Sequence, residues 1–172
     1  MMLDYCLESE GEMGIASIKK YSKTKTDPFP PVEELFGYGR IVHKEFLNDG
    51  RSNIILEGMG VARLEEYTST EPFRIAVVTK LDPIPMNKHD EELFQMIEEL
   101  IVLTKRILLR EGADDELILR MNSIQFHSHP IDFISSILHY DFGQKQEILV
   151  MTDNKERAQK LKRILEKLIL KD

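Results

Sequence analysis

The side chains in this sequence that could act as nucleophiles are one cysteine and a pair of adjacent serines. Cys6 is the only cysteine, and a thiol paired with a distant histidine could attack a carbonyl carbon. Cys6 also recurs with Leu3 and Leu7 at the spacing of one helical turn, where a small apolar residue is the more common role. Ser135 and Ser136 fall in the middle of an expected helix, whereas a Ser–Lys dyad needs a serine in a constrained, glycine-flanked setting. We therefore predict no catalytic nucleophile.

Metal binding and acid–base catalysis have little support in the pattern of ionisable residues. The five histidines are scattered, and the closest two, His127 and His129, would point to opposite sides of an extended segment, whereas a zinc site needs three or four convergent ligands. The carboxylate runs 90–92 and 114–116 have the position of helix N-terminal charges, which favour the helix dipole. The sequence contains no Gly-x-x-x-x-Gly-Lys-Ser/Thr loop to cradle phosphates. The prediction is a protein that is not an enzyme and holds no metal and no cofactor.

Aromatic side chains near a stiff loop are the first candidate for a binding role. Phe29 lies within the proline-rich stretch 27–31, and Phe36 and Tyr38 follow it. Exposed aromatic groups suit the capture of an unfolded polypeptide, which presents apolar side chains and a free backbone. The alternative is that the three residues pack as core at the end of a sheet. The sequence leaves both interpretations open.

A basic patch is the second candidate. Its members are Lys19, Lys20, Lys23 and Lys25, which surround Tyr21. Lysines interleaved with an aromatic residue could contact RNA phosphates and stack on a base. Such loops are more often solvated edges that block unwanted strand pairing, and the formal net charge of −7 opposes binding to a polyanion. RNA binding is therefore the alternative to peptide binding.

Length and composition place these candidates in a globular protein. The chain has 172 residues, of which 42% are hydrophobic and 31% are charged, as in folded rather than disordered proteins. No apolar run approaches the length needed to cross a bilayer, and the first residues lack the basic start and apolar core of a signal peptide. A single cysteine fits a reducing compartment. We expect a cytoplasmic protein with no membrane contact.

The first half of the chain has the pattern of β-strands. Strands are predicted over residues 13–21, 39–47, 51–57, 61–67 and 73–81, after a short helix that ends at Gly11. Apolar and polar residues alternate along the last strand, as in a half-buried strand. Asn48-Asp49-Gly50 supplies a hairpin turn, and Gly58-Met59-Gly60 is expected to break the chain before the fourth strand. The result would be a small antiparallel sheet, curled toward a barrel.

The second half has the pattern of helices. Helices are predicted over residues 90–110, from Pro130 onward, over 144–151 and from Asp153 to near the C-terminus. Gly112 ends the first of them, and Pro130 stands at a first turn, where its missing N–H costs nothing. Asp153 with Glu156 three residues on forms a capping box. Strands followed by helices make the predicted fold class α+β, and residues 83–88 are expected to join the two parts.

The first half also contains an ordered series of short motifs. Residues 39–42 read Gly-Arg-Ile-Val, the hairpin Asp49-Gly50 follows, and residues 56–58 read Leu-Glu-Gly. Next come a strand that contains Arg63 and the run Pro-Phe-Arg-Ile-Ala-Val at residues 72–77. Taken in this order, the motifs resemble the core of the Lon protease N-terminal domain family. The opening helix and the helical half are similar to the rest of that domain, so the resemblance covers nearly the whole chain.

The resemblance implies a PUA-like β-domain over residues 1–85, a helical bundle over residues 86–172, and a role in recognising protein substrates. Compared with the family, the expected first strand and a Phe-x-Pro-x-Tyr segment before the first helix are missing, and Phe36 stands where a glycine is usual. No ATPase or protease domain follows the bundle in this sequence, so we expect a stand-alone version of the domain.

The resulting prediction is a non-catalytic module that binds exposed apolar segments of client proteins, with a separate protease as a further partner. If the first strand is missing, an open sheet edge could accept a client strand or pair two copies as a homodimer. RNA binding through the lysine patch is the alternative. A small-ligand pocket, as in cereblon, whose β-domain is a relative, would need a separate zinc-holding domain that this sequence lacks.

Overall fold

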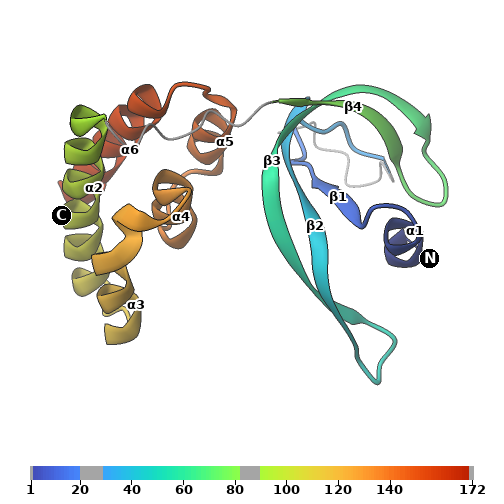
Figure 1. The fold of residues 1–172 in the computed structure, drawn as a ribbon, viewed down its shortest axis with the longest axis horizontal. Helices are drawn as coiled ribbons and strands as arrows, with labels where there is room; N and C mark the ends of the chain where they lie inside the picture. The colour runs from blue at the N-terminus through green and yellow to red at the C-terminus, as the bar shows by residue number, and fades with distance from the viewer. Residues whose placement is uncertain (1, 20–28, 82–89, 171–172) are drawn as a thin grey trace. The chain divides into compact units, whose positions relative to one another are not determined.

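The computed structural model describes residues 2–19, 29–81 and 90–170, and the chain divides into two compact units, residues 1–83 and 84–172. The first unit, called the β unit below, contains α1 (Met2–Glu8), β1 (Glu12–Ile15), β2 (Leu35–Phe46), β3 (Ser52–Ser69) and β4 (Ile75–Leu81) (Figure 1). The second, the helical unit, contains α2 (Glu91–Arg110), α3 (Asp115–Arg120), the 3₁₀ helix η1 (Met121–Phe126), α4 (Pro130–Ile137), α5 (Phe142–Val150) and α6 (Asn154–Ile169). The predicted join over residues 83–88 lies outside the described residues.

The long hairpin of β2 and β3 is the main feature of the β unit. The expected break at residues 58–60 is wrong, because β3 runs through these residues as one strand paired with β2. The ladder shifts register just before Gly39 and again after Ile41. A Cβ atom on Gly39 would lie 2.4 Å from the carbonyl oxygen of Glu57. Glycine here allows two bent strands to approach closely, rather than ending one of them.

The turn of this hairpin lies where the sequence places it. Gly50 has a φ angle of 84°, a region that costs glycine little and other residues more. The Asp49 carboxylate accepts hydrogen bonds from the backbone N–H of Arg51 at 3.1 Å and from its Nε at 2.7 Å. The local side-chain bonds therefore fix the turn, as expected for an aspartate–glycine pair.

The sheet is antiparallel throughout, in the order β1-β2-β3-β4. β1 and β4 stand at opposite ends of this order, yet the Glu12 carboxylate on β1 lies 2.7 Å from Nζ of Lys80 on β4. The sheet therefore curls until its two edge strands approach each other. β1 ends well before the predicted strand 13–21 does, and beyond it one isolated bridge joins Ile18 to Val32.

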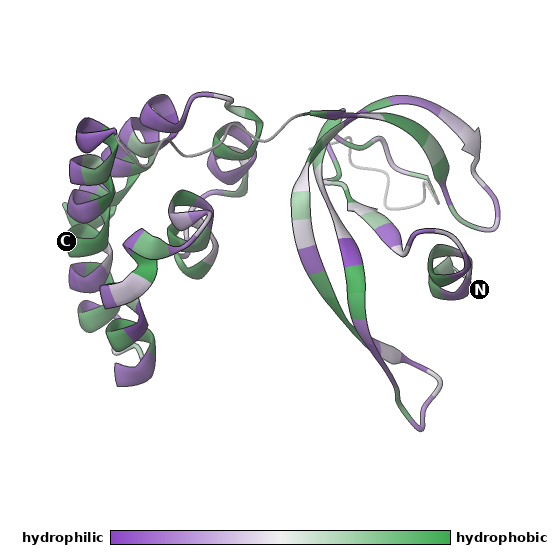
Figure 2. Cartoon of the chain, viewed as in Figure 1, coloured by the Kyte–Doolittle hydropathy of each residue, from purple (hydrophilic) through white to green (hydrophobic). Residues whose placement is uncertain are grey.

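The helical unit is built around its first and last helices. On α2 and α6, Glu92 lies 2.6 Å from Lys155 and Glu99 lies 2.6 Å from Lys162, so the two helices run side by side in the same direction. Hydrophilic and hydrophobic residues alternate along both helices, as expected for amphipathic helices (Figure 2). The largest fully buried apolar side chains of this unit are Ile97, Leu100, Ile107, Met121, Ile134, Leu138, Ile148, Leu161 and Leu165.

Helix ends in this unit follow local sequence signals. Asp90, Asp141 and Asp153 each accept a backbone N–H at the start of α2, α5 and α6, at 3.1, 3.1 and 2.9 Å. Gly112 stands just past the end of α2 with a φ angle of 69°. The sequence pattern did not indicate α3 and η1, whose short turns follow directly after Gly112. Among the described helices, none is both long and apolar enough to cross a membrane.

Candidate binding surface

Phe36 belongs to the core of the β unit. It pairs with Ala62 across the β2–β3 ladder, and both side chains are buried. β1 lies directly on its ring, since a Cβ atom on Gly14 would come within 2.6 Å of Phe36 Cε2. Of the two interpretations that the sequence leaves open for this residue, the structure therefore favours the core role.

Tyr38 is half-buried beneath an ion pair. Its ring packs against Gly60, where a Cβ atom would lie 3.2 Å from Tyr38 Cε1. On the other side, Lys80 Nζ stands 5.2 Å from the ring centroid and 2.7 Å from the Glu12 carboxylate. The hydrogen bond to Glu12 raises the pKa of Lys80 above its ordinary value. The accessible part of the Tyr38 ring is therefore bordered by charge.

Phe29 is 39% exposed and belongs to a cluster with Tyr67, which is 40% exposed. The link between them is Arg74, whose Cζ lies 5.6 Å from the Phe29 centroid and 5.5 Å from the Tyr67 centroid. Arg74 Nη2 also donates a hydrogen bond to the carbonyl oxygen of Pro30 at 2.8 Å. One guanidinium therefore ties the Phe29–Pro30 segment to β3 and to the start of β4, while both rings keep an accessible face.

Two exposed isoleucines lie on neighbouring segments. Ile15 ends β1 and is 58% exposed, and Ile18 is 61% exposed. Backbone hydrogen bonds of 2.7 and 2.9 Å pair residues 17–19 with residues 31–33, which directly follow the Phe29 segment. We define the Phe29 surface as Ile15, Ile18, Phe29 and Tyr67. These exposed side chains come from three segments of the β unit, which are connected by backbone hydrogen bonds and by the Arg74 contacts.

The lysine patch falls mostly outside the described residues, which exclude Lys20, Lys23 and Lys25. Lys19 is described, and its Nζ lies 3.3 Å from the Glu34 carboxylate. A lysine that is paired with a carboxylate offers less charge to a phosphate group. The described member of the patch therefore adds no support to the RNA alternative.

The far end of the hairpin carries another exposed aromatic residue, Phe46. Lys44 Nζ stands 4.2 Å from its ring centroid and 2.8 Å from the Asp4 carboxylate on α1. The hydrogen bond from Lys44 holds the pKa of Asp4 down to about 2. Phe46 lies at the end of one strand beside this ion pair. The Phe29 surface contains residues from three segments, and it is therefore the better candidate for binding an extended ligand.

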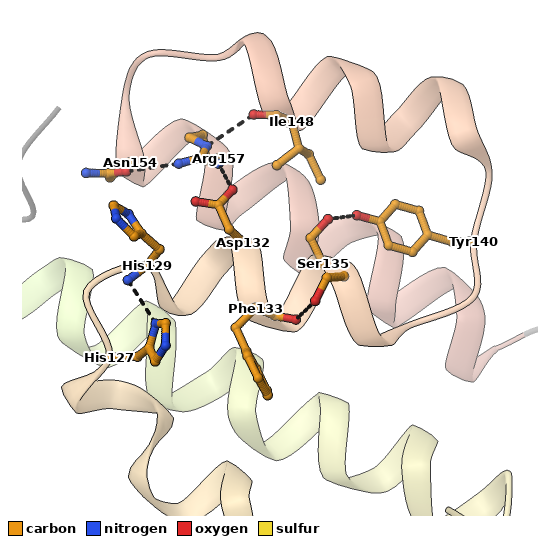
Figure 3. A network of polar contacts seen from close by, with 10 residues as sticks. His127, His129, Asp132, Phe133, Ser135, Tyr140, Ile148, Asn154 and Arg157 are labelled. Atoms are coloured by element: carbon orange, nitrogen blue, oxygen red, sulfur yellow. Dashed lines mark hydrogen bonds and ion pairs between the residues drawn. The ribbon is translucent and has the colours of Figure 1, made fainter. Parts of the chain in front are cut away.

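Polar groups of the helical unit form a network that ties helices together (Figure 3). Arg157 on α6 pairs with Asp132 on α4, and its Nε donates to the Ile148 carbonyl on α5 at 3.1 Å. The hydroxyl groups of Ser135 and Tyr140 are hydrogen-bonded to each other, and burial raises the pKa of Tyr140. Because each group already has a partner within the unit, these contacts stabilise the packing of α4, α5 and α6.

Two further candidates from the sequence, His127 and Cys6, have surroundings that the structure describes. His127 Nδ1 accepts the backbone N–H of His129 at 3.2 Å (Figure 3). Burial raises the pKa of the Cys6 thiol, which disfavours the reactive thiolate. In the part of the chain that the structure describes, no group of three or more His, Cys, Asp or Glu side chains is placed to hold a metal ion.

Sequence reasoning found Phe29 but missed Tyr67 and Arg74. Period-2 alternation around residue 74 indicates only that Arg74 and Phe73 point to opposite faces. Nothing local indicates that Arg74 meets a loop 44 residues earlier in the chain. Such contacts depend on how far the sheet curls.

Comparisons with known proteins identify a family and several relatives that this chain resembles. The model of the ATP-dependent protease La (LON) substrate-binding domain matches residues 1–167. The Lon protease of Amoebophilus asiaticus is 28% identical over 171 residues, which is 96% of this chain and 20% of that protein. The Lon protease of Cytophaga hutchinsonii is 25% identical over 144 residues, or 80% of this chain and 18% of that protein. The chain thus spans about a fifth of the length of these relatives.

Solved structures show the same fold. The N-terminal domain of the Mycobacterium avium complex Lon protease has a TM-score of 0.67 at 18% identity, covering 95% of this chain and 82% of that chain. A Lon N-terminal domain protein from Xanthomonas campestris has a TM-score of 0.54 at 16% identity, covering 99% of this chain and 81% of that chain. These likenesses confirm the predicted α+β fold class.

A curled antiparallel sheet followed by a helical unit is the architecture of a Lon N-terminal domain. The chain belongs to the family of LON substrate-binding domains. The family is described by substrate binding rather than by catalysis, and this description does not favour RNA as the ligand. The chain is therefore a substrate-binding module by family, which confirms the predicted resemblance.

Proposed function

We propose that this chain binds exposed apolar segments of client proteins, and that the Phe29 surface is where they bind. The single observation that carries the proposal is that Ile15, Ile18, Phe29 and Tyr67 are all exposed on connected segments of a substrate-binding domain. Apolar side chains that remain accessible on a folded protein mark interaction sites when they occur together. Of the three aromatic residues predicted for this role, the proposal retains Phe29.

Phe29 offers an accessible ring that is already held in place. Its contact with Arg74 and the hydrogen bond from Arg74 to Pro30 fix the segment before a ligand arrives. A fixed side chain loses less conformational entropy on binding than a free one. An unfolded client would place an apolar side chain against this ring and the neighbouring isoleucines. Delivery of that client to a separate protease, and pairing of two copies through an open sheet edge, stay predictions.

The test is binding of a fluorescently labelled unfolded protein, such as β-casein, measured by anisotropy at low and high salt. Phe29→Ala should weaken binding by about tenfold, because a central aromatic contact contributes on the order of 1–2 kcal/mol. Phe126→Ala is the matched control: Phe126 is 80% exposed but lies in the helical unit. Affinity should fall much less with salt than it would for binding driven by several phosphate contacts.

Two results would contradict the proposal. One is the absence of binding to unfolded protein by the wild-type chain. The other is an equal loss of affinity in the Phe29→Ala and Phe126→Ala variants, because the binding surface would then not be confined to the β unit.

A further inference from the structure

Arg74 lies between the Phe29 and Tyr67 rings of the Phe29 surface. Within residues 2–19, 29–81 and 90–170, no carboxylate lies at ion-pair distance from its guanidinium, whereas Arg40 and Arg51 of the same unit lie 3.8 and 2.6 Å from the carboxylates of Glu12 and Asp49. The hydrogen bond that Arg74 makes runs from Nη2 to the carbonyl oxygen of Pro30. This bond supplies an acceptor but no negative charge.

The surroundings of Arg74 make a counter-ion valuable. The side chain is partly buried, and a cation removed from water is costly unless a charge and hydrogen-bond acceptors replace the lost hydration. The rings of Phe29 and Tyr67 supply cation–π attraction, but they supply no negative charge. A guanidinium carries five N–H groups in a planar fork that matches the two oxygens of a carboxylate.

We propose that Arg74 is a receptor for a carboxylate of the bound client, so that the Phe29 surface selects apolar segments that carry a carboxylate beside their apolar side chains. This inference rests on the proposed function and deepens it by naming the ligand's polar group. The carboxylate has two sources, an aspartate or glutamate side chain and the free C-terminus of the client. Both present the same pair of oxygens to the guanidinium.

The test uses three versions of one short labelled peptide made of leucine, phenylalanine, alanine and serine. The first ends in a free carboxylate, the second ends in an amide, and the third ends in an amide but has one serine replaced by glutamate. Wild-type protein should bind at least one carboxylate peptide about tenfold more tightly than the neutral amide. A preference for the first peptide alone identifies the C-terminal source, and a preference for the third identifies the side-chain source.

Two variants connect this preference to Arg74. Arg74→Gln should bind all three peptides with equal affinity, because the substitution removes the positive charge and the planar set of N–H donors. Arg63→Gln is the matched control, since Arg63 is an exposed arginine of β3 in the same unit, and it should keep the wild-type preference. The wild-type comparison among the three peptides does not depend on any variant being folded.

The outcomes separate this inference from the proposed function. If the neutral amide and the carboxylate peptides bind wild-type protein equally well, the carboxylate receptor is wrong while apolar binding stands. If a preference exists but survives in folded Arg74→Gln protein, Arg74 is not the receptor. If no version binds, the proposed function and this inference fall together.

Discussion

Replacing Gly39 with alanine tests the account of the long hairpin. The added Cβ atom would lie 2.4 Å from the Glu57 carbonyl oxygen, about 1 Å inside the 3.4 Å at which ordinary contact begins. The oxygen belongs to the backbone of the paired strand, so relief requires the strands to separate rather than a side chain to rotate. Overpacking of this kind costs about 1–3 kcal/mol, against a gain below about 1 kcal/mol from a less flexible unfolded chain.

The expected net loss for Gly39→Ala is therefore about 1 kcal/mol, which corresponds to a fall of roughly 6 °C in the Tm of a unit of this size. Urea unfolding followed by two-dimensional NMR would measure it, because separate backbone peaks report on the β unit and the helical unit. Only peaks from the β unit should shift their unfolding midpoint. The helical unit supplies an internal reference within each sample.

Gly58 provides the matched control, since it is the direct partner of Gly39 in the β2–β3 ladder. A Cβ atom on Gly58 would meet no atom within 4 Å. Gly58→Ala should therefore leave stability unchanged within about 0.5 kcal/mol or raise it slightly. The reasoning is refuted if Gly39→Ala is as stable as the wild type, or if both substitutions cost the same.

Three further predictions concern buried or paired polar groups. Thr104→Val should stabilise the helical unit by about 1 kcal/mol in urea unfolding, because the Thr104 hydroxyl is fully buried and has no hydrogen-bond partner among the described residues; a loss of stability would mean that this hydroxyl has a partner. Asp4 has a pKa lowered from 3.8 to about 2 chiefly by its hydrogen bond with Lys44, so its ion pair stabilises the fold above about pH 4 and this contribution is lost as the pH falls toward 2. Asp4→Asn should remove that part of the acid dependence, and an NMR titration in which the Asp4 carboxyl titrates at its ordinary pKa would contradict the assignment. Burial raises the pKa of Tyr140, so this residue should ionise after exposed tyrosines in an ultraviolet titration, and its contribution to stability should fall as the pH rises above about 10. Tyr140→Phe should abolish the late-ionising group.

Local features of this chain could be predicted from the sequence because local interactions decide them. Asp153 caps α6 and Gly112 follows the end of α2, since a side-chain acceptor and a positive φ angle need only a few neighbouring residues. The hairpin turn at Asp49-Gly50 is of the same kind. The apolar stripe of α2 likewise follows from helical periodicity alone.

Features that depend on the curvature of the sheet could not be predicted in this way. The glycines at positions 58 and 60 favour the end of a strand. β3 nevertheless continues through them, because Gly39 on the facing strand lets the two backbones approach closely. Phe36 becomes core because Gly14 leaves room for its ring under β1. Arg74 reaches Phe29 across a separation that no local pattern encodes. The sequence therefore predicted one residue of the candidate surface, Phe29, but not its contact with Arg74.

The pairing of α2 with α6 has a consequence for the order of events during synthesis. The ion pairs Glu92–Lys155 and Glu99–Lys162 each join residues 63 positions apart. The part of the α2 stripe that packs against α6 therefore stays uncovered on the ribosome until α6 has emerged, whereas the β unit is complete much earlier. During that interval the nascent helical unit exposes an apolar helix face, which is prone to aggregation until α6 covers it.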